Sequence, residues 1–96
     1  MFVLLVRYKC KPGCRASYYD ANRKERIDEL SCEEEGCIRY EYSYGLADDE
    51  LLLTEVWRDE EAIEVHKNSA HFAKLGELKS ELVENTEIMK FSAQQV

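Results

Sequence analysis

The chain has 96 residues, enough for one domain spanning 1–96, and a domain of this size often gains stability from a partner subunit. Its net charge is −7, with 13 basic against 20 acidic residues, so it repels phosphate backbones and we expect no nucleic-acid partner. No apolar run reaches the roughly 18 residues of a membrane span, and the apolar N-terminal segment lacks the basic flank of a signal peptide, so we expect no membrane partner and a cytoplasmic location.

The first half of the chain predicts a strand, a helix and a second strand. Residues 2–9 are rich in Val, Leu and aromatic side chains, which favours a strand, and the Lys-Pro-Gly turn that follows ends it. Residues 15–33 place apolar side chains at helical spacing, although Arg23 interrupts the stripe, and Gly36 is a typical helix breaker. Residues 37–44 alternate as a strand does, with Arg39, Glu41 and Ser43 on one face. The other face consists of Ile38, Tyr40, Tyr42 and Tyr44.

The second half predicts a strand, two consecutive helices and a last strand. A turn cluster at 45–50 joins the preceding strand to a strand at 51–58, which indicates a hairpin. Asp59 is a good N-cap for a helix, and Ser69 is a good N-cap for a second one. Residues 87–91 form a short final strand. Leu51, Leu53, Glu55 and Trp57 share one face of the strand at 51–58, and Leu52, Thr54 and Val56 share the other. The inner stripes of the two helices consist of Ala62, Ile63 and His66, then Phe72, Leu75, Leu78 and Leu82.

The order of these elements, β-α-β-β-α-β, predicts an α+β, ferredoxin-like fold with an antiparallel sheet. The first and third strands carry large apolar residues on both faces, whereas the helices of this fold cover only one face of the sheet. A second apolar face left in water would be a large exposed patch. We therefore expect a homodimer in which two copies of the sheet cover each other.

The four cysteines are Cys10, Cys14, Cys32 and Cys37, with spacings C-x3-C and C-x4-C. Neither spacing is the C-x2-C of structural zinc sites, and a predicted helix separates the two pairs. We expect free thiols, with a Cys10–Cys14 disulfide as the alternative under oxidation.

Two histidines and one carboxylate form the candidate catalytic group: His66, His71 and Glu55. A buried carboxylate beside an imidazole fixes the tautomer of the ring and raises its basicity, so a pairing of Glu55 with either histidine would make a general base. The alternative is that His66 is a semi-buried structural residue and that His71 faces water. The two histidines are five residues apart, unlike the four-residue spacing of zinc-binding helices, so we expect no metal ligands.

The candidate substrate-binding side chains are aromatic and polar. Trp57, Phe72 and Tyr40 would form the walls of a pocket for a planar ligand, and Asn22 and Arg23 would reach it from the first helix. The alternative is that the aromatic residues only pack in the core or at the dimer interface.

Three stretches of the chain resemble the antibiotic biosynthesis monooxygenase family, whose members are small dimeric α/β barrels. Residues 55–72 follow the pattern E-x-W-x-D-x-x-A-x-x-x-H-x-x-S-x-H-F, Lys11–Gly13 resembles the family's turn after the first strand, and Glu35–Glu41 resembles the start of its second strand. The haem-degrading branch has a tryptophan where this chain has His66 and a haem-ligating histidine where it has Gly76, so the resemblance implies no haem.

The resemblance implies a cofactor-independent monooxygenase that oxidises a quinol or phenolic small molecule with O2. His66 or His71 would be the base in that reaction, and the substrate would be a small aromatic or quinol-like molecule. The first alternative is an isomerase of a small phosphorylated ketone, as in autoinducer processing, with Arg39, Lys67 and Lys74 near the phosphate. The second is a non-catalytic small-molecule binding or stress-response dimer.

Overall fold

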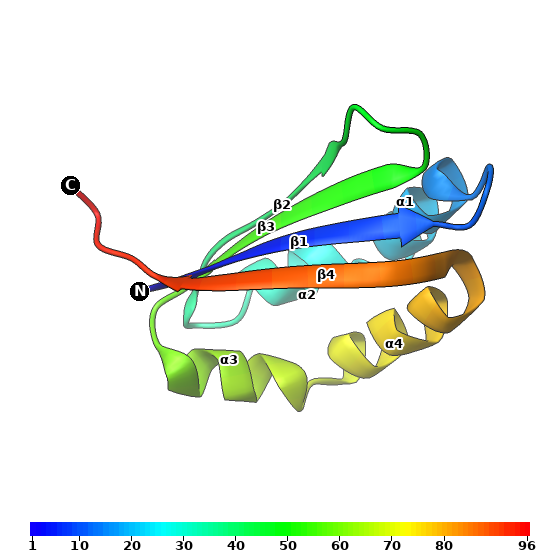
Figure 1. The fold of residues 1–96 in the computed structure, drawn as a ribbon. Helices are drawn as coiled ribbons and strands as arrows, with labels where there is room; N and C mark the ends of the chain where they lie inside the picture. The colour runs from blue at the N-terminus through cyan, green and yellow to red at the C-terminus, as the bar shows by residue number, and fades with distance from the viewer.

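A four-stranded antiparallel sheet forms one layer of the molecule, and four helices lie against one of its faces (Figure 1). The structure is a computed structural model that describes residues 1–96. The elements in chain order are β1 (Phe2–Cys10), α1 (Arg15–Lys24), α2 (Ile27–Cys32), β2 (Cys37–Tyr44), β3 (Glu50–Trp57), α3 (Glu60–Lys67), α4 (Ala70–Leu82) and β4 (Val83–Ser92). None of the helices combines the length and the apolar character that a crossing of a lipid bilayer requires.

The sheet has the strand order β2-β3-β1-β4, so β1 lies in the interior between β3 and β4. Leu5 is paired with Thr54 on one side and with Met89 on the other. Two βαβ halves joined by the β2–β3 hairpin give this order, which confirms the ferredoxin-like α+β fold predicted from the sequence.

Two features of the first half differ from the sequence prediction. The single helix expected over 15–33 is broken, because Arg26 adopts a left-handed conformation with φ of 57° and separates α1 from α2. In β2 the register with β3 shifts between Cys37 and Arg39, so Ile38 lies in a bulge and is exposed, although the alternation placed it on the face of buried Tyr40.

The last strand is also longer than the predicted 87–91, since β4 follows α4 directly at Val83.

Both predicted helix caps of the second half are present. The Asp59 carboxylate accepts a hydrogen bond from the backbone N–H of Ala62 at 2.8 Å, and the Ser69 hydroxyl accepts one from the N–H of Phe72 at 3.2 Å. These caps start α3 and α4 on either side of a sharp turn at Asn68. The turn brings the C-terminal end of α3 next to the N-terminal end of α4, which positions His66 near His71.

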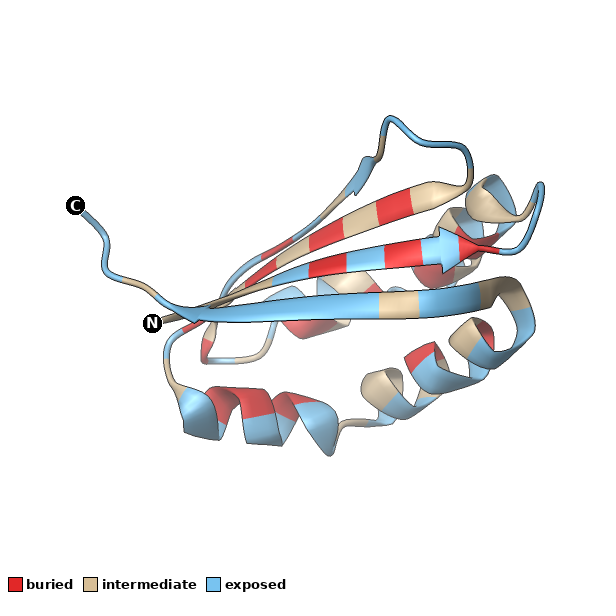
Figure 2. Cartoon of the chain, in the orientation of Figure 1, coloured by how far each residue is buried: buried red, intermediate tan, exposed pale blue.

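The hydrophobic core lies between the sheet and the helices, and the alternation of burial along β1 and β3 follows the strand period (Figure 2). Every second residue of β3 is buried, as the alternation of the strand predicts, and the buried face is that of Leu51, Leu53, Glu55 and Trp57. Tyr8, Tyr18 and Ile27 fill the space toward α1 and α2.

All four cysteines are free thiols.

The face of the sheet that carries no helix is largely apolar. The pairings of β1 with β3 and β4 place Leu5, Leu52 and Met89 on this face. Leu5 and the residues Met89 and Phe91 of β4 are 42%, 55% and 46% exposed. A pocket of about 390 Å³ lies on this side of the sheet, and its lining includes Leu5, Leu52, Thr54 and Met89.

Candidate active site

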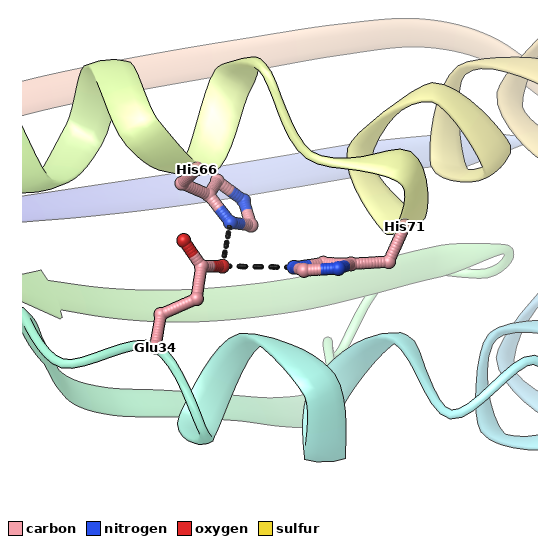
Figure 3. A group of neighbouring side chains, drawn as sticks. All are labelled: Glu34, His66 and His71. Carbon is pink, nitrogen blue, oxygen red and sulfur yellow. Dashed lines mark hydrogen bonds and ion pairs between the residues drawn. The ribbon is translucent and has the colours of Figure 1, made fainter.

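The carboxylate of Glu34 lies between the two histidines and contacts both (Figure 3). Its Oε2 is 2.6 Å from Nδ1 of His66 and 2.8 Å from Nε2 of His71. The side chains of Glu34, His66 and His71 are 12%, 4% and 13% exposed, so the group is largely shielded from water. We refer to these three residues as the Glu34 triad.

Three separate segments supply the Glu34 triad. Glu34 lies in the loop between α2 and β2, His66 is in the last turn of α3, and His71 is in the first turn of α4. The Ser69 hydroxyl donates to the backbone carbonyl of His66 at 2.6 Å while it caps α4, so the turn between the two helices is fixed by the same side chain. This holds the two imidazoles at a centroid separation of 5.6 Å.

The hydrogen bonds of the triad determine which nitrogen of each ring is basic. A carboxylate oxygen accepts hydrogen bonds and does not donate, so Nδ1 of His66 and Nε2 of His71 both carry the proton and donate to Glu34. In neutral rings this leaves Nε2 of His66 and Nδ1 of His71 with free lone pairs. Burial lowers the pKa of His66, and the attraction of Glu34 opposes this shift only in part, so the ring is neutral at neutral pH.

Aromatic rings surround His66 on several sides. The ring centroids of Trp57, Phe72 and Tyr40 lie 4.6, 5.3 and 5.9 Å from that of His66. The structure therefore brings together five residues singled out from the sequence: His66, His71, Trp57, Phe72 and Tyr40. A desolvated, neutral imidazole among aromatic walls is suited to removing a proton from a phenol or an enol.

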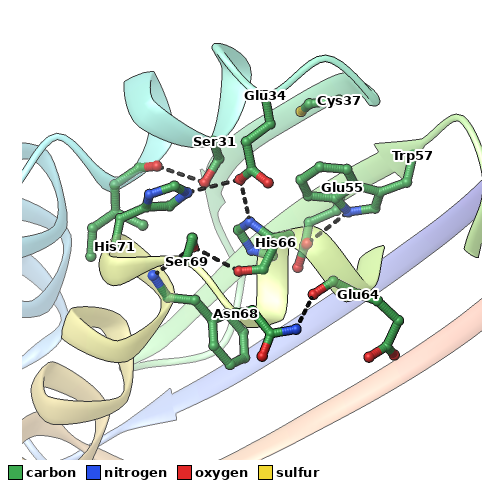
Figure 4. Close-up of polar contacts among 12 residues, drawn as sticks. Ser31, Glu34, Cys37, Glu55, Trp57, Glu64, His66, Asn68, Ser69 and His71 are labelled. Carbon is green, nitrogen blue, oxygen red and sulfur yellow. Dashed lines mark hydrogen bonds and ion pairs between the residues drawn. The ribbon is translucent and has the colours of Figure 1, made fainter. Parts of the chain in front are cut away.

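Glu55 lies in the same region but not in the predicted pairing (Figure 4). Its Oε1 accepts a hydrogen bond from the indole N–H of Trp57 at 3.0 Å, and the carboxylate that contacts the histidines is that of Glu34. Burial raises the pKa of Glu55, and the bond from Trp57 opposes that shift. Glu55 thus holds the Trp57 ring in place beside His66.

The two residues expected from the first helix lie elsewhere. Asn22 is fully buried in the core, where its amide donates to the carbonyl of Tyr18 and accepts from the hydroxyl of Tyr42 at 3.0 Å. Arg23 is half exposed and pairs with Asp28 and with the hydroxyl of Tyr19. The structure does not bring either of them to the Glu34 triad.

Sequence reasoning missed Glu34, because Glu33 and Glu35 on either side have the same character and the run resembles a solvated surface. Glu34 differs only in position, two residues before Gly36. The cations considered for a phosphate are dispersed: Arg39 pairs with Glu41, and Lys67 and Lys74 also pair with acids on the surface.

Two further features limit the chemistry of this region. Neither the pocket of about 390 Å³ on the helix-free face nor a second, polar pocket around Arg7 and Glu50 is lined by His66 or Glu55. Burial also raises the pKa of Cys37 to about 12, so this thiol stays protonated at neutral pH and is a poor nucleophile.

The family model described as antibiotic biosynthesis monooxygenase matches residues 1–78, and the chain belongs to this family. No curated protein sequence matches the chain. A conserved protein from Bacteroides thetaiotaomicron, described as of unknown function and a possible oxidoreductase, is 27% identical, with a TM-score of 0.83 and coverage of 94% of each chain. A conserved protein from Methanosarcina mazei is 26% identical, with a TM-score of 0.86 and coverage of 97% of this chain and 92% of that one.

A third similar structure is a candidate antibiotic biosynthesis monooxygenase from Nitrosomonas europaea. It is 20% identical, with a TM-score of 0.88 and coverage of 99% of this chain and 100% of that one. At this level of identity the likeness shows the fold alone.

Proposed function

We propose that the protein is a monooxygenase that oxidises an electron-rich quinol or phenol with O2 and requires no bound cofactor. The observation that carries this proposal is the Glu34 triad, in which Glu34 orients a neutral, buried imidazole among aromatic rings. Membership of a monooxygenase family supports the reaction class.

The reaction begins with transfer of the phenolic proton to Nε2 of His66. The phenolate then gives one electron to O2, and the resulting superoxide and phenoxyl radical combine to form a C–O bond. Cleavage of the O–O bond leaves one oxygen atom in a quinone product and releases the other as water with the two hydrogens that the substrate loses. Desolvation by Trp57, Phe72 and Tyr40 favours the first step, because a base acts more strongly when water does not compete for the proton.

The substrate would have to reach Nε2 of His66, which points away from Glu34 because Nδ1 of the same ring faces that carboxylate. Because the aromatic rings pack closely around His66, a planar substrate has to displace side chains, and Phe72 is the partly buried wall best placed to move. We expect substrate binding to rearrange this residue.

We also propose that the active form is a homodimer closed by the helix-free faces of two sheets. The apolar face described above supports this arrangement, since it would otherwise remain in water. Members of the family are commonly dimers. A contact of this kind is hydrophobic and two-fold symmetric, and we expect it to be permanent.

The test is oxygen consumption by the purified protein with a series of naphthoquinol-like substrates, corrected for autoxidation with heat-denatured protein. His66→Ala should lower kcat by about 100-fold or more, the usual contribution of a general base. Lys67→Ala, a change at the next residue of the same helix on its exposed side, is the matched control and should leave kcat unchanged. If no electron-rich quinol or phenol is consumed faster than the background, the monooxygenase assignment is wrong.

A further inference from the structure

The ligand atoms of the Glu34 triad are close enough together to share one metal ion. Nδ1 of His66, Nε2 of His71 and a carboxylate oxygen of Glu34 all lie within 4.8 Å of one another. Two histidines and one glutamate are a ligand set that binds zinc and related divalent ions in proteins. We propose that Glu34, His66 and His71 bind one divalent transition-metal ion, such as Zn²⁺, in place of the two hydrogen bonds that now join them.

The distances require only a small adjustment. Bonds of about 2.0–2.1 Å in a tetrahedral site put neighbouring ligand atoms roughly 3.3 Å apart. The two contacts of Glu34 Oε2 are 2.6 and 2.8 Å, so the carboxylate has to retreat by about half an ångström, and the two imidazole nitrogens have to approach each other. Glu34 lies in a loop and not in a helix or strand, which gives its side chain that freedom.

A second observation concerns the other oxygen of the same carboxylate. Oε1 of Glu34 is buried and has no hydrogen-bond partner, which is uncommon for a buried carboxylate oxygen. An ion held between the imidazoles would give this oxygen a partner, because a glutamate can coordinate through both oxygens. The partial exposure of Glu34 and His71 leaves a route by which an ion can enter.

Metal binding and the proposed base function exclude each other through the tautomer of His66. Without an ion, Glu34 holds the proton on Nδ1 and leaves Nε2 basic. With an ion on Nδ1, a neutral ring must carry its proton on Nε2 and can no longer accept one from a substrate. A bound divalent ion should therefore inhibit oxygen consumption. This inhibition rests on the proposed function, whereas the metal binding itself does not.

The experiment uses the full-length, tag-free protein, reduced and stripped of metal with a chelator. Calorimetric titration with Zn²⁺ should show one ion per chain, and saturation should raise Tm. Glu34→Gln and His71→Gln should each weaken binding more than about tenfold, while the glutamine at position 71 can still donate to Glu34. Glu35→Gln makes the same change one residue further along the loop, at a side chain that is 92% exposed, and should bind Zn²⁺ as the unaltered protein does.

The four cysteines are the competing ligands, so the double variant Cys32→Ser/Cys37→Ser and a titration with Co²⁺ are included. Co²⁺ bound to the triad should give visible absorption bands without the intense near-ultraviolet band that sulfur ligands produce. The same spectrum in the cysteine variant supports the triad as the site. Equal Zn²⁺ affinity in Glu34→Gln and His71→Gln, or loss of binding in the cysteine variant, overturns the proposal. Circular dichroism shows whether each variant is folded. If Glu34→Gln does not fold, the comparison of His71→Gln with the unaltered protein decides the test. Calorimetry decides the question even if no substrate is oxidised.

Discussion

Gly36 lies directly against Ala62 of α3, so closely that a Cβ built on Gly36 would be 2.2 Å from the Ala62 Cβ. The backbone carbonyl of Gly36 also accepts a hydrogen bond from the N–H of Arg58 at 2.8 Å. These two contacts hold the loop that contains Glu34 against the first turn of α3 and the residues just before it. The position of the Glu34 carboxylate beside His66 therefore depends on the absence of a side chain two residues away.

Gly36→Ala should destabilise the protein and separate Glu34 from His66. The added methyl cannot fit without a backbone shift, and overpacking of this kind costs about 1–3 kcal/mol. Thermal denaturation should show a Tm several degrees lower. Gly76→Ala is the control, because nothing lies within 4 Å of a Cβ at that position in α4, and it should stabilise the helix by up to about 1 kcal/mol. Equal Tm values for Gly36→Ala and the unaltered protein would contradict the packing described here.

Glu55→Gln should stabilise the protein at neutral pH and not at acidic pH. Burial raises the pKa of Glu55 above its usual 4.5, so the folded state retains the proton to a higher pH than the unfolded chain. Stability therefore falls as pH rises from about 4.5 through the folded-state pKa and stays lower above it. Glutamine keeps an oxygen for the indole N–H of Trp57 and carries no charge.

The measurement for Glu55→Gln is Tm from pH 4 to pH 8. The variant should exceed the unaltered protein at pH 7, and the difference should shrink toward pH 4. Glu35→Gln, an exposed position, serves as the control and should show no such trend. A constant difference across the range would mean that Glu55 is not responsible for the pH dependence.

Two tyrosine hydroxyls on β2 should differ in their contribution to stability. The hydroxyl of Tyr42 donates to Asn22 at 3.0 Å, whereas the hydroxyl of Tyr40 is buried without a partner. Tyr42→Phe should lower the free energy of unfolding by about 1 kcal/mol or more, because the Asn22 oxygen loses its donor. Tyr40→Phe should be neutral or stabilising in the same denaturant titration. A larger loss in Tyr40→Phe than in Tyr42→Phe would show that Tyr40 has a partner in solution.

Leu5→Glu should convert the proposed dimer to monomers. Leu5 lies in the middle of the helix-free face, and a charge there would be buried against the second copy without a partner. Light scattering at micromolar concentration measures the mass directly. Leu46→Glu is the control, since Leu46 is fully exposed in the β2–β3 connection and should leave the mass unchanged. A monomeric mass for the unaltered protein would contradict the dimer itself.

Local patterns were sufficient to predict most of the fold. The strand alternation of β3 and the caps Asp59 and Ser69 depend on neighbouring residues, so they are visible in the sequence and match the structure. The break at Arg26 and the bulge at Ile38 are not local in this sense. Neither residue has a type that marks the position, because arginine is uncommon in the left-handed conformation and isoleucine is typical of a regular strand.

Only part of the candidate site could be grouped from the sequence, for a similar reason. His66, Trp57 and Phe72 could be grouped because one stretch of 18 residues, 55–72, contains them all. Glu34 approaches from a segment 32 residues before His66, and it reaches the histidines only because of the close contact of Gly36 with α3. Glu55 was the natural candidate within the stretch, but its side chain bonds to Trp57 two residues away on the same face of β3.

The central position of β1 has a consequence for how the chain folds. Phe2 is paired with Ser92 and Lys9 with Asn85, so the first strand completes its hydrogen bonds only with the last one. During synthesis, one side of β1 stays open until Val83–Ser92 has emerged from the ribosome, and an open strand edge can pair with other chains. Contacts so distant in sequence also slow folding. Newly made chains should therefore be most prone to aggregate just before β4 docks, and chaperones that shield exposed strand edges should raise the yield.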